Sequence, residues 1–179
     1  MRAVVVYESM YGNTHAVAEA IGDGLRPVYD VVVVPVGRAG PEVVEGAQLL
    51  VVGGPTHVHG MTRPHSREAA AEVARKPGST VDLEDGADGP GVREWLVSLG
   101  HLNVLAAAFD TRMNGPAMFT GRASKGISRE LIRHGAHPVA PPESFMVTKQ
   151  NSLEAGEEAR ARRWGRLLAE EDVTLSTRG

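Results

Sequence analysis

The chain has 179 residues, of which 42% are hydrophobic and 23% charged, and its formal net charge at pH 7 is −3. This length and composition fit one soluble globular domain over residues 1–179, and the small negative charge argues against nucleic acid as a partner. Cysteine is absent, which excludes disulfides, thiolate catalysis and iron–sulfur ligation. The first apolar run, residues 3–6, is too short for a signal peptide or a membrane span, so we expect a cytoplasmic protein.

Five apolar runs predict the strands. The first four, residues 3–7, 29–34, 48–52 and 104–109, are almost wholly apolar rather than alternating, which is typical of strands that are covered on both faces of a parallel sheet. A weaker fifth run covers residues 138–147.

Helical patterns separate these runs. The side chains expected to face inward are Val17, Ala20, Ile21 and Leu25; Trp95, Leu96 and Leu99; Ile127, Leu131 and Ile132; and Ala161, Trp164, Leu167 and Leu168. We expect Gly22 and Gly24 to mark the fraying end of the first helix, and Ser152 to cap a last helix over residues 152–171. A short helix is expected at residues 66–75. The alternation of strand and helix predicts a doubly wound α/β sandwich.

A polar segment, "KPGSTVDLEDGADGPG", interrupts this alternation at residues 76–91. Its glycines, prolines and acids predict a mobile surface loop, because its flanks belong to one alternating series. By its position after the third strand, we expect it at the rim of the ligand-binding end of the sheet.

The turn after the first strand, residues 8–14, leads directly into a helix and contains no lysine or arginine. Unpaired backbone N–H groups at a helix start bind anions, and Ser9, Asn13 and Thr14 add polar side chains. Gly12 allows the backbone to curl around a ligand. This turn therefore predicts either a phosphate site made of oriented dipoles or an ordinary capped strand–helix turn. A Walker A loop and a Rossmann glycine motif are both missing.

Three motifs carry a resemblance to a known family. "SMYGNT", residues 9–14, resembles the phosphate loop [ST]-x-[ST]-G-x-[ST] of the flavodoxin superfamily, with Tyr11 in place of the middle hydroxyl residue. "GGPTHVHGMTRP", residues 53–64, is similar to its second flavin loop. The segment after the fourth strand, "FDTRMNGPAMFTGRASKGI" at residues 109–127, has "FTG" before a helix and is similar to its third. The motifs are closest in style to flavodoxin-like quinone reductases and to the flavodoxin modules of A-type flavoproteins. The resemblance covers roughly residues 1–170.

The resemblance implies a flavodoxin-like three-layer α/β/α sandwich with a five-stranded parallel sheet in the order 2-1-3-4-5. It also implies that FMN is the cofactor, with its phosphate in the first loop and its isoalloxazine ring between the other two. The implied cofactor-binding residues are Ser9, Met10, Tyr11, Gly12, Asn13, Thr14, Pro55, Thr56, His57, Val58, His59, Gly60, Thr111, Arg112 and Met113.

The sequence departs from the family pattern at the flavin ring. The two positions where flavodoxins stack an aromatic side chain hold Val58 and, near the second, Pro116. Each lost stacking partner costs about 0.5–1.5 kcal/mol beyond area burial, so flavin affinity is expected to be weak. His57, His59, Met61 and Met113 are the side chains expected to cover the ring instead.

The charges near the expected ring bear on its chemistry. The loops flanking the ring offer one acid, Asp110, against the basic side chains of His57, His59, Arg63 and Arg112. Positive charge stabilises the anionic reduced flavin. We therefore expect an oxidoreductase that passes electrons from NAD(P)H through FMN to a quinone or another acceptor. Two alternatives remain open, namely a one-electron carrier that serves a redox protein partner, and a flavodoxin-like domain that has lost flavin and acts through protein contacts. The sequence leaves open self-association into a homo-oligomer and replacement of FMN by a deazaflavin.

His57, His59 and His65 also invite a metal interpretation. A complete site needs further ligands at a fixed geometry, and no cysteine is available. We expect these histidines to face flavin or solvent rather than a metal ion.

Overall fold

The computed structural model describes residues 1–57, 60–116 and 120–176. Its centre is a parallel sheet of four full strands, β1 (Arg2–Tyr7), β2 (Asp30–Pro35), β3 (Leu49–His57) and β5 (Leu105–Met113). The fifth position is shared by β6 (His137–Pro138) and β7 (Glu143–Val147), which both pair in parallel with β5. The order β2-β1-β3-β5-β6 confirms the predicted 2-1-3-4-5 order. The numbering differs because a two-residue strand, β4 (Gly60–Met61), folds back antiparallel on the end of β3.

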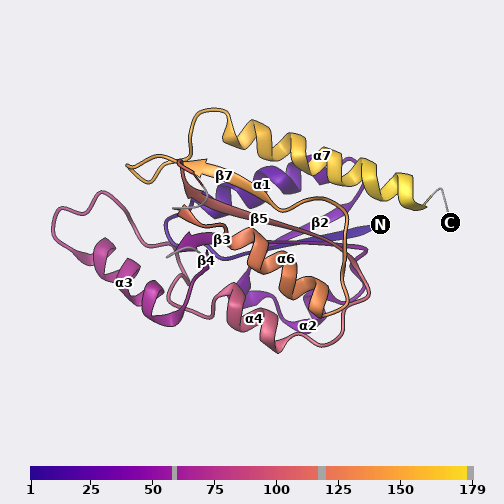
Figure 1. Cartoon of the computed structure of the whole chain (residues 1–179), viewed down its shortest axis with the longest axis horizontal. Coiled ribbons are helices and arrows are strands. Elements are labelled where there is room, and N and C mark those ends of the chain that lie inside the picture. The colour runs from indigo at the N-terminus through magenta and orange to yellow at the C-terminus, as the bar shows by residue number, and fades with distance from the viewer. Residues whose placement is uncertain (58–59, 117–119, 177–179) are drawn as a thin grey trace.

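Helices cover both faces of the sheet (Figure 1). The long helices α1 (Asn13–Leu25) and α7 (Glu157–Ser176) lie on one face, and α2 (Pro41–Val44), α4 (Val92–Ser98) and α6 (Ala123–Arg133) lie on the other. A single 3₁₀ turn, η1 (Val36–Arg38), follows β2, and α3 (Pro64–Arg75) projects beyond the sheet at the end where the strands finish. Within the described ranges, no helix combines the length and the apolar character needed to cross a membrane.

The apolar strands bury side chains on both faces of the sheet, as their composition predicts. One core lies under α4 and α6 and includes Val4, Val52 and Ile127. The other lies under α1 and α7 and is built around Phe109 and Trp164. Each core holds alternate residues of the same strands, so the sheet is fixed from both sides.

Two glycines in α1 have a different role from the one expected. Gly22 and Gly24 are buried, and the helix continues past them to Leu25. A Cβ atom on Gly24 would collide with the carbonyl oxygen of Arg162, and one on Gly165 would collide with that of Ile21. The glycines therefore allow α1 and α7 to approach backbone to backbone. They do lie in the last turn of α1, as expected, but this turn is packed rather than frayed.

Three further expectations about helices are also wrong. The last helix begins at Glu157 rather than after Ser152, because residues 148–156 form a turn that ends at Gly156, with φ of +86°. Leu167 and Ile132 are 56% and 52% exposed. Each directly adjoins a residue that does face inward, so the helical rotation of about 100° per residue turns it away from the core.

Candidate functional site

The three loops identified in the sequence meet at the carboxyl ends of β1, β3 and β5 and surround one cavity of about 250 Å³. The residues that line it are Ser9, Met10, Tyr11, Asn13, Thr14, Pro55, Thr56, His57, Thr111, Arg112, Met113, Val147 and Asn151. Ligands of open parallel sheets bind at this end, beside the point where the strand order reverses.

Eleven of these thirteen residues belong to the set that the sequence implied. Of the rest of that set, Gly12 lies within the first loop as the residue preceding α1, and Gly60 lines a neighbouring cavity. Val58 and His59 lie outside the described residues. Of the side chains expected to cover a flavin ring, Met113 is half exposed and Met61 is buried.

The first loop curls around Gly12, whose φ of +88° is in the left-handed region. The Gly12 N–H donates to Ser9 Oγ at 3.1 Å, and a Cβ atom on Gly12 would meet no atom within 4 Å. The turn therefore needs glycine for its backbone conformation, not because a neighbour crowds the position.

The loop is tied to its neighbours by polar side chains. The hydroxyl oxygens of Thr14 and Thr111 lie 2.7 Å apart in a buried contact, which joins the start of α1 to the end of β5. Asn13 Nδ2 donates to the carbonyl oxygen of Asn151 at 2.9 Å. These contacts fix two walls of the cavity before any ligand binds.

Sequence reasoning missed the fourth wall, which Val147 and Asn151 supply from the end of β7 and the turn after it. Asn151 has φ of +60° and is the one described non-glycine residue with a positive φ. The signal was available, because this turn follows the fifth strand and so lies at the same edge of the sheet as the other loops. Asparagine also tolerates the left-handed conformation better than most residues.

Two hydrogen-bond donors of the lining residues lack partners. Arg112 Nε and Asn151 Nδ2 are buried and have no hydrogen-bond partner among the described residues. Arg112 Nη1 is occupied, since it donates to the carbonyl oxygen of Gly115 and to Thr120 Oγ1, both at 2.8 Å. Arg112 Nε and Asn151 Nδ2 have essentially no accessible surface, so they lie behind the cavity wall rather than facing a ligand in the cavity.

Asp110, which the sequence placed beside the ring, has another role. It is fully buried, and its Oδ2 accepts a hydrogen bond of 2.7 Å from the backbone N–H of Ser124. Thr56 Oγ1 accepts in the same way from Ala123 N at 2.9 Å. The ends of β3 and β5 thus cap α6, and Asp110 does not line the cavity.

His57 lies at the end of β3 and lines the cavity. Burial of its imidazole lowers its pKa below the ordinary value of 6.5. The ring is therefore neutral at about pH 7, and it adds no positive charge to the site.

The buried carboxyl group of Glu8 supports the first loop. Glu8 Oε1 accepts a hydrogen bond from Thr62 Oγ1, and Oε2 accepts one of 2.8 Å from the Val92 N–H. Burial, which outweighs these hydrogen bonds and the nearby Arg67, raises the pKa of Glu8 above its ordinary value. Glu8 therefore joins the first loop to the segment after β4 and to the start of α4.

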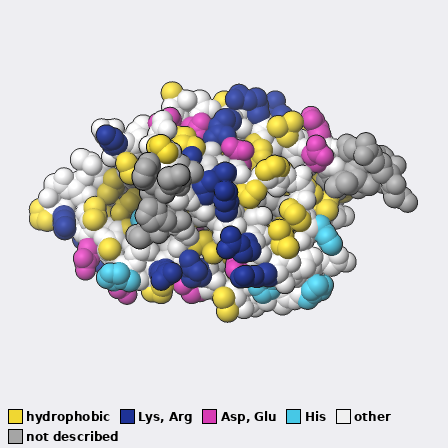
Figure 2. Space-filling view, viewed as in Figure 1, with side chains coloured by type: hydrophobic (Ala, Val, Ile, Leu, Met, Phe, Trp, Pro, Cys, Tyr) yellow, Lys and Arg dark blue, Asp and Glu magenta, His cyan; other side chains and the backbone are white. Residues whose placement is uncertain are grey.

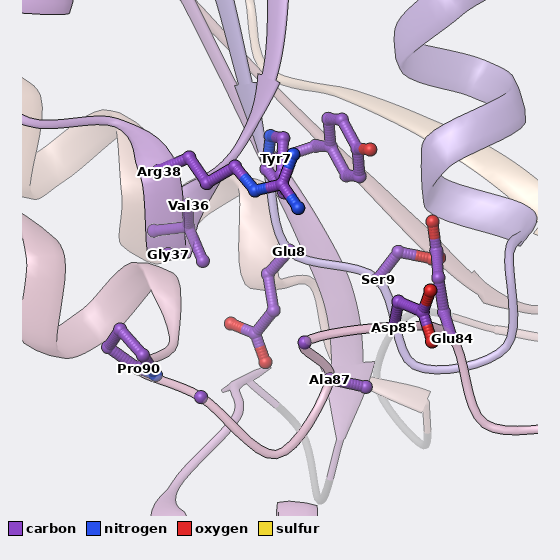
Figure 3. Close-up of a pocket in the computed structure, with 13 residues that line it drawn as sticks. Tyr7, Glu8, Ser9, Val36, Gly37, Arg38, Glu84, Asp85, Ala87 and Pro90 are labelled. Carbon is purple, nitrogen blue, oxygen red and sulfur yellow. The ribbon is translucent and has the colours of Figure 1, made fainter.

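A second cavity, of about 280 Å³, lies on the other side of the first loop (Figure 3). Glu84 and Asp85 lie on the Ser9 side of it, and the Arg38 guanidinium reaches in from η1. The Glu84 N–H donates to the Met10 carbonyl oxygen at 2.9 Å, and Ala87 is buried against Met10. The polar segment 76–91 is therefore attached to the first loop at the ligand-binding end, where the sequence placed it.

Among the described residues, no group of three His, Cys, Asp or Glu side chains is arranged to hold a metal ion. His65 lies at the start of α3, and His57 lies at the end of β3.

Comparison with known proteins identifies the family. The model of the flavodoxin family matches residues 5–99, which are more than half of the chain. The chain belongs to the flavodoxin family. This family binds FMN, and the matched span contains the first and second loops of the cavity. Comparison with curated protein sequences gave no significant match.

Solved structures of flavodoxins share this fold over nearly the whole chain. An archaeal flavodoxin is 22% identical with a TM-score of 0.61, covering 96% of this chain and 98% of that one. Oxidised flavodoxin 1 from Bacillus cereus is 18% identical with a TM-score of 0.64, covering 95% and 98%. A WrbA-like flavodoxin from Agrobacterium tumefaciens is 16% identical with a TM-score of 0.55, covering 94% and 95%. At these identities the likeness concerns the fold.

Proposed function

We propose that this flavodoxin-family chain binds FMN in the cavity between its three loops and carries single electrons between protein partners. The observation that supports this most strongly is the cavity itself, which brings the turn around Gly12 together with the ends of β3 and β5. The N–H groups at the start of α1 and the Arg112 guanidinium are donors that suit the phosphate and carbonyl oxygens of FMN. FMN supplies reversible electron chemistry that no side chain of the chain offers.

The chain's own residues have distinct roles in this proposal. The backbone of the loop around Gly12 and the start of α1 hold the phosphate with oriented N–H groups. Pro55, Thr56 and His57 form one wall for the ring system, and Thr111, Arg112 and Met113 form another. Asn151 closes the remaining side.

The charges around this cavity favour a carrier over the NAD(P)H-dependent oxidoreductase that the sequence suggested. That interpretation rested on four cationic side chains, of which His57 is neutral and Arg63 lines a neighbouring cavity. His59 lies outside the described residues. Arg112 alone remains as a cation in the lining. Fewer cations near the ring stabilise the anionic, two-electron-reduced flavin less. The one-electron-reduced flavin is then relatively more stable.

The direct test is titration of ligand-free protein with FMN and with riboflavin, followed by flavin absorbance and fluorescence. We expect FMN to bind more tightly than riboflavin, and Arg112→Gln and Asn151→Ala to weaken the binding of FMN. Arg129→Gln, an exposed position on α6 outside the cavity, is the matched control and should bind FMN as the unmodified chain does. Absence of any FMN binding by the folded chain would reject the proposal.

A further inference from the structure

Helix α6 carries a row of exposed cations that the proposed FMN site does not use. Lys125, Arg129 and Arg133 are spaced four residues apart, so they follow one another along one side of the helix. We call these three residues the cationic stripe. It begins in the first turn of α6, where the end of β3 at the FMN cavity holds the Ala123 N–H, and it ends in the last turn.

The charge of the stripe is largely unneutralised. The one acid in α6 is Glu130, which pairs with Arg133 at 2.5 Å. Within the described ranges, the side chains of Lys125 and Arg129 make no ion pair and no hydrogen bond. Like charges four residues apart destabilise a helix, so the stripe works against the stability of α6. An arrangement that opposes stability is expected where a surface has a function.

Two arginines beside the stripe also keep their charge. Arg93 of α4 donates to the carbonyl oxygens of Thr62 and Met61 at 3.2 Å each, and the Met61 side chain lies against Gly126 of α6. Arg122, which precedes α6, donates to a hydroxyl and a carbonyl oxygen around the start of β7. These oxygens carry no formal charge, so the guanidinium groups are held without being neutralised. Dark-blue Lys and Arg side chains accordingly gather over α4 and α6 (Figure 2).

Apolar side chains accompany these cations. Ile132 is 52% exposed and follows Arg129 by three positions, so it lies on the same side of α6. Val97 of the adjacent α4 is 80% exposed. Protein interfaces combine apolar side chains with arginine in this way. A nucleic acid or an anionic membrane is less favoured, because it meets the field of a chain whose net charge is −3.

We propose that α6 is the docking surface for a redox protein with an acidic face, whose carboxylates pair with the cationic stripe. The partner's role in electron transfer rests on the proposed function, whereas the electrostatic contact needs no flavin. Because α6 begins at the edge of the FMN cavity, a partner bound along the stripe has one end beside the flavin site.

The opposite charge at the other side of the cavity orients this partner. The acids of residues 82–88 belong to the segment that is attached to the first loop, whereas α6 is held by the ends of β3 and β5. An acidic face is therefore repelled from the side of the first loop and attracted to α6. Such asymmetry fixes the orientation of a charged partner and speeds its association.

The test is isothermal titration calorimetry of the full chain, FMN-loaded and flavin-free, with an acidic plant-type ferredoxin, a basic cytochrome c and a DNA duplex. We expect the ferredoxin to bind both forms more tightly than the other probes do. Its affinity should fall as ionic strength rises from about 0.02 M to about 0.15 M. It should also fall by about tenfold in the double variant Lys125→Gln/Arg129→Gln.

The matched control is the double variant Arg163→Gln/Arg166→Gln, which removes two exposed cations from α7 on the opposite face of the sheet. It should bind the ferredoxin as the unmodified chain does. Chemical denaturation checks folding. Lys125→Gln/Arg129→Gln should be no less stable than the unmodified chain, because it relieves the repulsion between like charges.

The outcomes are distinct. Equal loss of ferredoxin binding in both double variants, or no ferredoxin binding at low ionic strength, would overturn the proposal. Tighter binding of the DNA duplex than of the ferredoxin would overturn it too and identify a nucleic-acid surface. A chain that binds the ferredoxin through α6 but never binds FMN would reject the carrier function and leave the docking surface standing.

Discussion

The hydroxyl oxygens of Thr14 and Thr111 lie 2.7 Å apart, although 97 residues separate them in the chain. Thr14 is the second residue of α1, and Thr111 lies near the end of β5. Both side chains are buried and both residues line the FMN cavity. This contact connects the phosphate loop to a wall of the ring site. A substitution in the loop is therefore expected to alter the position of that wall.

Thr14→Val is expected to weaken FMN binding by about 1–3 kcal/mol, because valine keeps the shape but removes the hydroxyl and leaves that of Thr111 without its partner. Riboflavin binding should fall less, since that ligand lacks the phosphate. Thr14→Ser, which retains the hydroxyl, is the matched variant and should lose little. Fluorescence titration measures both ligands, and equal losses for FMN and riboflavin would remove Thr14 from the phosphate site.

Gly12→Ala tests the phosphate loop against a backbone control. Gly12 and Gly46 both have positive φ, +88° and +72°, and a Cβ atom on either would meet nothing within 4 Å. Both alanine variants should therefore lose a similar free energy of unfolding, about 1 kcal/mol. Only Gly12→Ala should also weaken FMN binding. If Gly46→Ala weakened it as much, the effect would be one of global stability.

Gly24→Ala is expected to lower the free energy of unfolding by about 1–3 kcal/mol, since α1 and α7 must separate to admit a methyl group. Gly100→Ala is the control, because a Cβ atom there meets open space. Chemical denaturation of both variants measures the difference. Equal stabilities would contradict the close helix contact.

Glu8 should make stability depend on pH. Burial raises its pKa above the ordinary 4.5, so the folded chain keeps the proton over a range where the unfolded chain has released it. The free energy of unfolding therefore falls as pH rises from 4.5 through the folded pKa. Glu8→Gln should remove this decline, because the amide is neutral at every pH and its oxygen still accepts from the Val92 N–H.

Denaturation at a series of pH values measures this effect, with the exposed Glu72→Gln as the control for loss of a carboxyl group. Glu157 acts in a different range. Burial tends to raise its pKa, but hydrogen bonds from Arg160 and from Met146 N–H outweigh that and lower it, so its stabilisation is lost as pH falls below 4.5. An unchanged decline above pH 4.5 in Glu8→Gln would contradict the assignment to Glu8.

Local pattern was sufficient for the sheet and for the first turn, whereas the other expected site residues came from the resemblance to flavodoxins. Apolar runs located every long strand, and the motif at residues 9–14 located the turn whose glycine has a positive φ. These features are local, because a buried parallel strand and a glycine-dependent turn each impose their own composition.

The remaining features depend on contacts that are distant in sequence. Glycine is typical of a helix end, so the sequence around Gly24 predicts one. The close approach of Gly165 from α7 is what requires glycine at position 24. In the sequence, Asp110 is an acid at the end of a strand. It caps a helix because the backbone N–H of Ser124 lies within hydrogen-bond distance of its carboxylate. His57 reads as a cation, but burial lowers its pKa. Tertiary packing decides all three roles.

The central claim is that the chain binds FMN and carries single electrons. Stepwise photoreduction of the FMN-loaded protein near neutral pH, followed by visible absorption, tests it most directly. The account predicts that a long-wavelength band of the half-reduced flavin rises and then falls as reduction proceeds. Direct conversion of oxidised to fully reduced flavin, with no such band, would contradict the carrier function and favour two-electron chemistry with NAD(P)H.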